Sequence, residues 1–149
     1  MSITALDTSV IVAALLRWHE SHEPALRALV AAGAARGNQL IVPAPALVEA
    51  YSVMTRLPAP HRLAPADALD LLSGSFEHKA AIVSLGETET WRFLHEAANR
   101  GLAGGRAYDA LILRCALKGG AARLLALDRR DFERLELAGI ELVVPETRG

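Results

Sequence analysis

Residues 104–112 read Gly-Gly-Arg-Ala-Tyr-Asp-Ala-Leu-Ile, and this stretch decides how the chain folds. It leads into a run at residues 107–117 that is apolar on nearly every side, which is the pattern of a buried helix. One acid, Asp109, lies at the start of this run. Because an ionised carboxylate is unfavourable to bury without a partner, either Asp109 points out of the core or positive charge compensates for it.

The composition predicts one ordinary globular domain. The chain has 149 residues, of which 52% are hydrophobic and 22% charged, so intrinsic disorder is excluded and residues 1–149 are expected to form a single domain. Only 5% of the residues are aromatic. A core built mainly of aliphatic side chains and alanine suits helices packed on a sheet better than an aromatic-rich β-sandwich.

The charge balance and the chain ends narrow the class of protein. A formal net charge of −1 argues against a broad basic surface for nucleic acid, although metal ions could supply positive charge at a local site. The single cysteine, Cys115, lies inside the apolar run and is expected to be a core residue. We expect no signal peptide and no membrane-spanning segment, and therefore a cytoplasmic protein.

Strand-like and helix-like segments alternate along the whole chain. This alternation predicts an α/β fold, a mainly parallel central sheet flanked by helices on both faces. The expected strands are residues 3–6, 39–42, 80–85, 122–127 and 140–144. The expected helices are residues 10–18, a segment from residue 21 to about residue 33, and residues 46–57, 65–73, 86–100 and 107–117.

The helix at residues 86–100 is predicted to be amphipathic. Trp91, Leu94, His95 and Ala98 are spaced to share one side of it, so we expect that side to face the core. A histidine on such a face is more often a satisfied core or edge residue than a metal ligand.

Four acids occupy matching positions in this pattern. Asp7 and Asp128 directly follow strands, while Glu49 and Asp109 are expected in the first turns of helices. Right-handed connections place the carboxyl ends of parallel strands at one edge of the sheet, so all four can converge there. The alternative is that each acid merely caps a helix or interacts with its dipole.

Converging carboxylates indicate a metal site. Like charges raise one another's pKa, and a divalent cation removes this conflict. Oxygen ligands without thiolate or imidazole favour Mg²⁺ or Mn²⁺ over zinc. Carboxylate-held Mg²⁺ is typical of phosphoryl chemistry, so the residues predict a metal-dependent phosphodiesterase, phosphatase or nuclease.

The motifs that carry these acids resemble a known family. Residues 6–9 (Leu-Asp-Thr-Ser), 47–49 (Leu-Val-Glu), 108–112 (Tyr-Asp-Ala-Leu-Ile) and 127–132 (Leu-Asp-Arg-Arg-Asp-Phe) are similar to those of a PIN domain, specifically the VapC class of bacterial toxin ribonucleases. The resemblance covers the whole chain in order and implies a PIN-like α/β/α sandwich. It also implies a metal-binding and catalytic set, made up of Asp7, Glu49, Asp109 and Asp128.

The resemblance has further implications for chemistry and partners. It implies Mg²⁺- or Mn²⁺-dependent hydrolysis of RNA, with Thr8 or Ser9 orienting the first acid or a water molecule. It also implies a homodimer and silencing by a cognate VapB-like antitoxin, whose C-terminal segment fills a groove of the toxin.

Three positions leave alternatives within the resemblance. Many relatives carry Thr or Ser two residues before the fourth acid, where this chain has Ala126. In some relatives the fourth acid falls at the position of Asp131; Asp128 is preferred because it directly ends the strand. Arg106 either contacts substrate phosphate or the acids, or is a surface charge at the start of a helix.

Two other functions remain open from the sequence. One is a small-molecule phosphatase with Asp7 as the nucleophile, although that chemistry usually wants a second acid two residues on, where Ser9 stands. The other is a non-catalytic protein-binding module in which the acids are helix caps.

Overall fold

The fold is built on a parallel sheet. The computed structural model describes residues 2–146, and within them the sheet has five strands in the order β3-β2-β1-β4-β5. Every neighbouring pair is parallel. The strands are β1 (Ile3–Leu6), β2 (Gln39–Pro43), β3 (Ala81–Val83), β4 (Arg123–Leu125) and β5 (Glu141–Val143).

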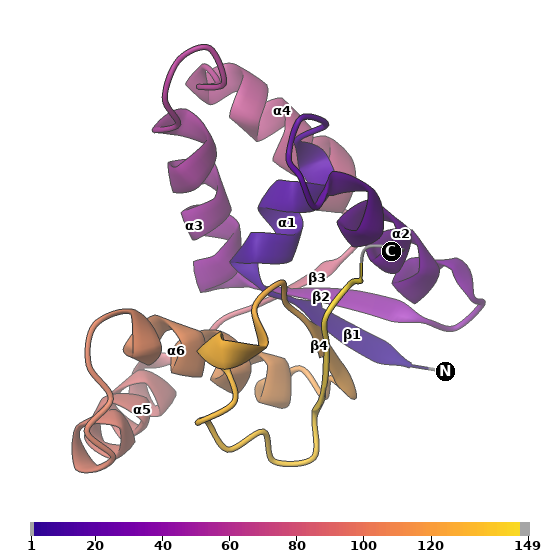
Figure 1. Ribbon diagram of the computed structural model, residues 1–149. Coiled ribbons are helices and arrows are strands. Elements are labelled where there is room, and N and C mark those ends of the chain that lie inside the picture. Colours follow the sequence, from indigo (N-terminus) through magenta and orange to yellow (C-terminus); the bar gives the residue numbers. More distant parts are fainter. Residues whose placement is uncertain (1, 147–149) are drawn as a thin grey trace.

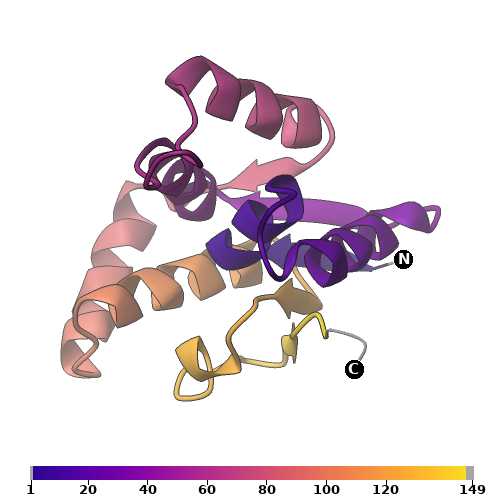
Figure 2. The same ribbon diagram turned by 45° about the horizontal axis from the view of Figure 1, so that its top comes forward.

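Helices cover both faces of this sheet. Figure 1 shows α1 to α4 grouped above the strands, with α5 and α6 below them, and Figure 2 shows α6 running along the underside. The predicted α/β/α sandwich is therefore confirmed. The helices are α1 (Thr8–Leu15), α2 (His22–Ala34), α3 (Ala44–Thr55), α4 (Pro65–Phe76), α5 (Glu87–Asn99) and α6 (Gly105–Lys118), and a short 3₁₀ turn, η1, spans Arg129–Asp131. Among the helices of residues 2–146, none has the length and apolarity needed to cross a lipid bilayer.

The central strand β1 is the core of the molecule. It pairs with β2 on one side and with β4 on the other, and Ala5 and Leu6 are completely buried. A strand covered by helices on both faces carries consecutive apolar residues instead of an alternating pattern. Below it, α6 contributes Ile112 and the buried Cys115 to the same core, as its apolar sequence predicted.

Three helices begin two residues earlier than the sequence indicated. The structure starts α1 at Thr8, α3 at Ala44 and α6 at Gly105. Pro45 lies in the first turn of α3, where its missing N–H group has no intrahelical role. Gly104 precedes α6 with φ of 59°, a conformation that glycine adopts without strain.

The buried side of α5 differs from the prediction. Phe93 and Ala97 are buried, whereas Trp91 is 61% exposed and His95 and Ala98 also face solvent. The helix packs on α6 along a narrow seam, where the Arg114 guanidinium lies 5.7 Å from the centre of the Phe93 ring. Phe93 and Ala97, four positions apart, fill that seam. Trp91 and Leu94 of the predicted apolar side are therefore left exposed to solvent.

Packing at the end of α6 generates a stability prediction. A Cβ added at Gly119 would collide with Ile41 Cδ1 and lie 3.2 Å from Val83 Cγ2. Overpacking of this kind typically costs about 1 to 3 kcal/mol. We expect Gly119→Ala to lower the free energy of unfolding in urea by that amount.

Gly105→Ala is the matched control for Gly119→Ala. Nothing lies within 4 Å of a Cβ built at Gly105, so this change should be neutral or slightly stabilising. Equal stability of the two variants would contradict the packing at Gly119.

Candidate active site

The topology creates a crevice beside β1. After β1 the chain crosses to β2 on one side, whereas after β4 it crosses to β5 on the other. Ligand sites of parallel sheets form where neighbouring strands send their connections in opposite directions. The two strand ends are tied together here, because the N–H of Asp7 donates to the carbonyl of Leu125 at 2.9 Å.

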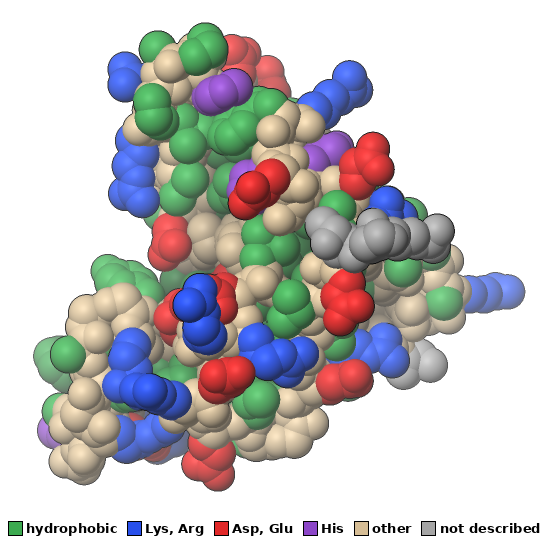
Figure 3. Space-filling view, viewed as in Figure 1, with side chains coloured by type: hydrophobic (Ala, Val, Ile, Leu, Met, Phe, Trp, Pro, Cys, Tyr) green, Lys and Arg blue, Asp and Glu red, His purple; other side chains and the backbone are tan. Residues whose placement is uncertain are grey.

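A cavity of about 250 Å³ lies at this crevice. Four acids line it, and they come from four different segments: the end of β1, α3, α6 and η1. The lining residues are Asp7, Thr8, Ser9, Val12, His19, Glu49, Val53, Asp109, Leu127 and Asp131. In Figure 3, acidic side chains gather where the upper helices meet the lower ones, next to basic side chains.

Asp7 is held in place by Ser9. Its Oδ2 accepts hydrogen bonds from the Ser9 N–H at 3.2 Å and from Ser9 Oγ at 2.5 Å, so Asp7 also caps α1. Ser9 Oγ in turn accepts from the N–H of Leu127 at 3.1 Å. Asp7 therefore caps α1, and Ser9 connects Asp7 to the segment after β4.

Thr8 has a hydroxyl without a partner. The residue is 5% exposed, and its Oγ1 is buried with no hydrogen-bond partner within residues 2–146. A buried unpaired hydroxyl is unfavourable. A hydroxyl of this kind beside a carboxylate is a possible ligand for water or a cation.

Glu49 and Asp109 lie deeper in their helices than the sequence indicated. Because α3 and α6 begin earlier, neither helix has an acid in its first turn, and both acids fall in the second turn. The interaction of a charge with a helix dipole is confined to the terminal turn. Helix capping therefore does not account for Glu49 or Asp109.

The acids raise one another's pKa. Burial, followed by the charges of Asp131, Asp7 and Glu49, raises the pKa of Asp109 to about 7. Burial also raises the pKa of Asp7, and the hydrogen bonds from Ser9 oppose this effect only in part. The cavity thus concentrates more negative charge than its surroundings compensate.

Asp131, not Asp128, is the acid of η1 that lines the cavity. Asp128 caps the turn and forms a two-pronged ion pair with Arg130, at 3.1 Å from Nε to Oδ1 and 2.8 Å from Nη2 to Oδ2. This hydrogen bonding to Arg130 lowers the pKa of Asp128. The structure thus gives Asp128 the task of shaping the turn that carries Asp131, whose pKa is raised by burial and by Asp128.

Arg106 and His19 differ in their relation to the cavity. Arg106 is exposed in the first turn of α6 and is absent from the cavity lining, as expected for a surface charge at the start of a helix. His19, which follows α1, does line the cavity. The sequence did not distinguish His19 as a site residue, because its approach to the acids depends on tertiary packing.

The donor set suits a hard divalent cation. Carboxylate oxygens are the preferred ligands of Mg²⁺ and Mn²⁺, and the raised pKa of both Asp7 and Asp109 shows the uncompensated charge that such a cation would neutralise. Across residues 2–146, no three Asp, Glu, His or Cys side chains stand close enough together to hold an ion. Carboxylates that share a cavity repel each other and stand apart, so the residues fit as potential ligands and not as a preformed coordination sphere.

The sequence of this chain matches the PIN domain family over residues 4–137. The chain belongs to this family. It is 42% identical to "Ribonuclease VapC40" of Mycobacterium tuberculosis over 142 residues, which cover 93% of this chain and 96% of the relative. It is also 39% identical to "Ribonuclease VapC27" of the same organism over 140 residues, covering 94% and 95% of the two chains. The resemblance to the VapC class is confirmed.

Solved PIN domain structures share the fold. Mycobacterium tuberculosis VapC20, described as a toxin that cleaves the sarcin-ricin loop, superposes with a TM-score of 0.71 at 16% identity, over 95% of this chain and 99% of that one. VapBC2 from Rickettsia felis, bound to a DNA fragment from its promoter, gives 0.61 at 19% identity, over 97% and 99%. At such low identity these structures support the fold alone.

The bridging hydroxyl of Ser9 can be tested by its removal. Ser9→Ala leaves the Leu127 N–H without its partner and deprives Asp7 of one hydrogen bond. Loss of such a bond costs about 1 to 3 kcal/mol when the partner stays buried. We expect urea unfolding to show a loss in this range.

Thr8→Val is the matched control for Ser9→Ala. It removes a buried hydroxyl that makes no hydrogen bond, and we expect its stability to equal or exceed that of the wild type. If Thr8→Val lost more stability than Ser9→Ala, the role of Ser9 Oγ as the link between Asp7 and Leu127 would be refuted.

The raised pKa of Asp109 predicts a pH-dependent stability. In the unfolded chain an aspartate loses its proton near pH 4, whereas folded Asp109 keeps it up to about pH 7. Between these values the folded state binds more protons, so this residue makes the metal-free protein less stable as pH rises. Asp109→Asn removes the effect.

Thermal unfolding in a chelator measures this difference. We expect Asp109→Asn to be more stable than the wild type at pH 8 by on the order of 1 kcal/mol, or about 2 to 4 °C in Tm. The two proteins should converge near pH 4. A difference that is constant from pH 4 to pH 8 would show that Asp109 is not responsible.

Proposed function

We propose that this protein is a metal-dependent endoribonuclease and the toxin of a toxin–antitoxin pair. The observation that carries the proposal is the set of carboxylates from four segments around one cavity, at the crevice of a PIN fold. The relatives at 42% and 39% identity are both named ribonucleases. The VapC20 toxin, which cleaves an RNA loop, shares the fold.

In this proposal Asp7, Glu49, Asp109 and Asp131 hold one or two Mg²⁺ or Mn²⁺ ions. When bound, a divalent cation supplies charge stabilisation for the phosphoryl group and activates a water molecule. Asp7 is oriented by Ser9, and Asp131 is presented by the Asp128-capped turn. Hydrolysis forms a P–O bond to the water oxygen and breaks a P–O bond of the RNA. The water's proton passes to a carboxylate or to solvent, and the leaving ribose oxygen takes up a proton from solvent.

Protein partners are part of the proposal. A cognate VapB-like antitoxin is supported by the structural relatives that are toxin–antitoxin complexes, such as VapBC2 and the FitAB complex bound to DNA. The sequence-based expectation of a homodimer stays a proposal. An exposed apolar surface supports contact with protein: Val48 is 67%, Leu69 58% and Ile82 47% exposed around a cavity between α3 and α4.

The other two functions are less well supported. In a phosphatase with Asp7 as the nucleophile, position 9 would be expected to carry an acid, but Ser9 is engaged with Asp7 and Leu127. In a non-catalytic module the acids would serve as caps. Only Asp7 among the four cavity acids caps a helix, and the others gain nothing structural from being brought together.

Substitution of the acids tests the proposal. We expect Asp7→Asn and Asp109→Asn to abolish cleavage of RNA in Mg²⁺ or Mn²⁺ while the fold persists by circular dichroism. The loss should exceed the 10- to 100-fold that is typical of groups that only support a metal ligand. Wild-type cleavage by both purified variants would refute the metal site.

Asp128 and Asp131 form a matched pair in the same assay. Asp131→Asn should lose activity as Asp109→Asn does, together with Mn²⁺ binding measured by calorimetry. Asp128→Ser keeps a capping oxygen at the start of η1 and should keep most of the activity. The reverse ranking would show that Asp128 is the fourth ligand.

A further inference from the structure

We propose that Trp18, His19 and His61 form a subsite that binds an unpaired nucleotide of the RNA substrate, away from the bond that is cleaved. This proposal rests on the proposed function. It deepens it by naming the side chains that hold a base of the strand at a distance from the cleaved bond.

His19 connects this subsite to the acids. It lines the same cavity as Asp7 and Asp109, with Val12 and Val53 contributing the apolar wall. His19 is ten positions after Ser9 in the sequence, and most of the residues between them belong to α1. Ser9 and His19 are therefore on the order of 10 to 15 Å apart. A group at that distance contacts a different nucleotide from the one that is cleaved.

The imidazole of His19 has a defined proton. Its Nδ1 accepts a hydrogen bond from the N–H of Ser21 at 3.0 Å, so the ring proton resides on Nε2. Of the ten residues that line the cavity, His19 has the one side chain with a nitrogen donor. Its Nε2–H can donate to a phosphate oxygen or to an acceptor on a base without adding to the negative charge of the cavity.

Trp18 and His61 provide the stacking surface. Their rings are stacked with centres 4.0 Å apart and planes inclined by 26°, and the ring of His19 lies 5.9 Å from that of Trp18. Trp18 is nevertheless 46% exposed, and His61 is exposed too. An exposed aromatic pair is the surface on which proteins stack unpaired bases, whereas a duplex offers no free base face there.

Both loops that carry these rings are held by hydrogen bonds. His22 Nδ1 lies 2.9 Å from the carbonyl of Ala13 and fastens the loop after α1 to that helix. On the other side, the N–H of His61 donates to Pro58 at 3.0 Å. The surface is therefore formed before substrate arrives, which reduces the entropy lost on binding.

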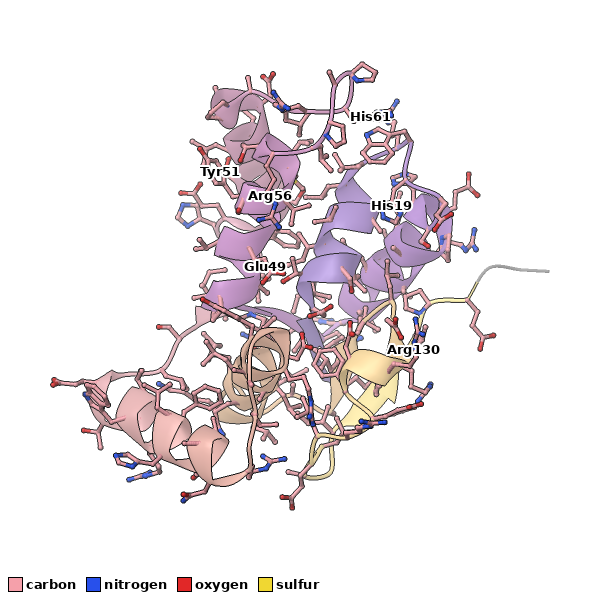
Figure 4. All side chains as sticks on the ribbon, turned by 60° about the vertical axis from the view of Figure 1, so that its left-hand side comes forward. His19, Glu49, Tyr51, Arg56, His61 and Arg130 are labelled. Atoms are coloured by element: carbon pink, nitrogen blue, oxygen red, sulfur yellow. The ribbon has the colours of Figure 1, made fainter. Side chains whose placement is uncertain are left out.

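Basic side chains accompany the rings. Arg17 and Arg62 directly adjoin Trp18 and His61 in the sequence, and both are exposed. Arg56 directly follows α3, and Figure 4 shows it above Glu49. Basic side chains at these positions suit the phosphate backbone of RNA, in a chain whose overall charge is −1.

Fluorescence offers a direct test, because the chain has two tryptophans, Trp18 and Trp91. In the Asp109→Asn/Trp91→Phe protein, Trp18 is the sole tryptophan. Addition of a single-stranded oligoribonucleotide in Mg²⁺ should quench its emission. The matched control is Asp109→Asn/Trp18→Phe, in which Trp91 on α5 should show no change. An equal response of the two proteins, or no response of Trp18, would overturn the subsite.

Kinetics provide the second test. Loss of one base stack by alanine substitution corresponds to about a 5- to 150-fold loss of binding. We expect Trp18→Ala to lower kcat/KM within that range mainly through KM, and Trp18→Phe to restore most of it. His19→Ala should raise KM similarly, and His19→Gln, which keeps an N–H donor, should do so less. Substrates trimmed to the nucleotides at the cleaved bond should show no difference between Trp18→Ala and the wild type.

The outcomes separate this proposal from the proposed function. If the wild type cleaves RNA and Trp18→Ala, folded by circular dichroism, has the same kcat/KM, the subsite is wrong and the ribonuclease stands. If Trp18 responds to a protein partner and not to RNA, the surface is a protein contact. If the wild type does not cleave RNA but Trp18 is quenched by it, the proposed function fails and the nucleotide subsite stands.

Discussion

The hydrogen bond between the Ser9 hydroxyl and the Asp7 carboxylate is the contact on which the site depends. The same hydroxyl accepts from the backbone of Leu127, so one side chain connects the end of β1, the start of α1 and the segment after β4. This link adds to the pairing of β1 with β4 and to the backbone bond from Asp7 to Leu125. The buried Asp7 therefore helps to join the two strands between which the crevice opens.

The general architecture could be read from the sequence because it depends on local patterns. Short, mainly apolar runs in Ile3–Leu6 and Gln39–Pro43 and the alternation of strands with helices predict the parallel sheet, whose carboxyl edge carries the acids. The exact helix starts could not be predicted from the sequence. Ala44 and Gly105 join their helices because of the backbone conformation of the residues before them, Pro43 and Gly104. The buried side of α5 and the choice between Asp128 and Asp131 also depend on tertiary contacts: the seam with α6 and the Arg130 ion pair.

Charged side chains are distributed unevenly in this molecule, although the net charge is only −1. The acids converge on one cavity, where burial and mutual repulsion raise the pKa of Asp109, while Arg17 and Arg62 adjoin Trp18 and His61 in the sequence. In the proposed function a cation offsets the charge of the acids, and the arginines suit the phosphates of the strand. This arrangement explains how a chain with a net charge of −1 can be suited to RNA through local chemistry instead of a broad basic face.

The order of the strands in the sheet also has a consequence for the synthesis of the protein. β4 lies directly beside the central β1, although 116 residues separate Leu6 from Arg123, the first residue of β4. The acids of the cavity are likewise spread from Asp7 to Asp131, so they cannot meet until the chain through Asp131 has left the ribosome. A chain that ends before Asp131 therefore has no assembled cavity, and the protein cannot act through this site while it is still being made.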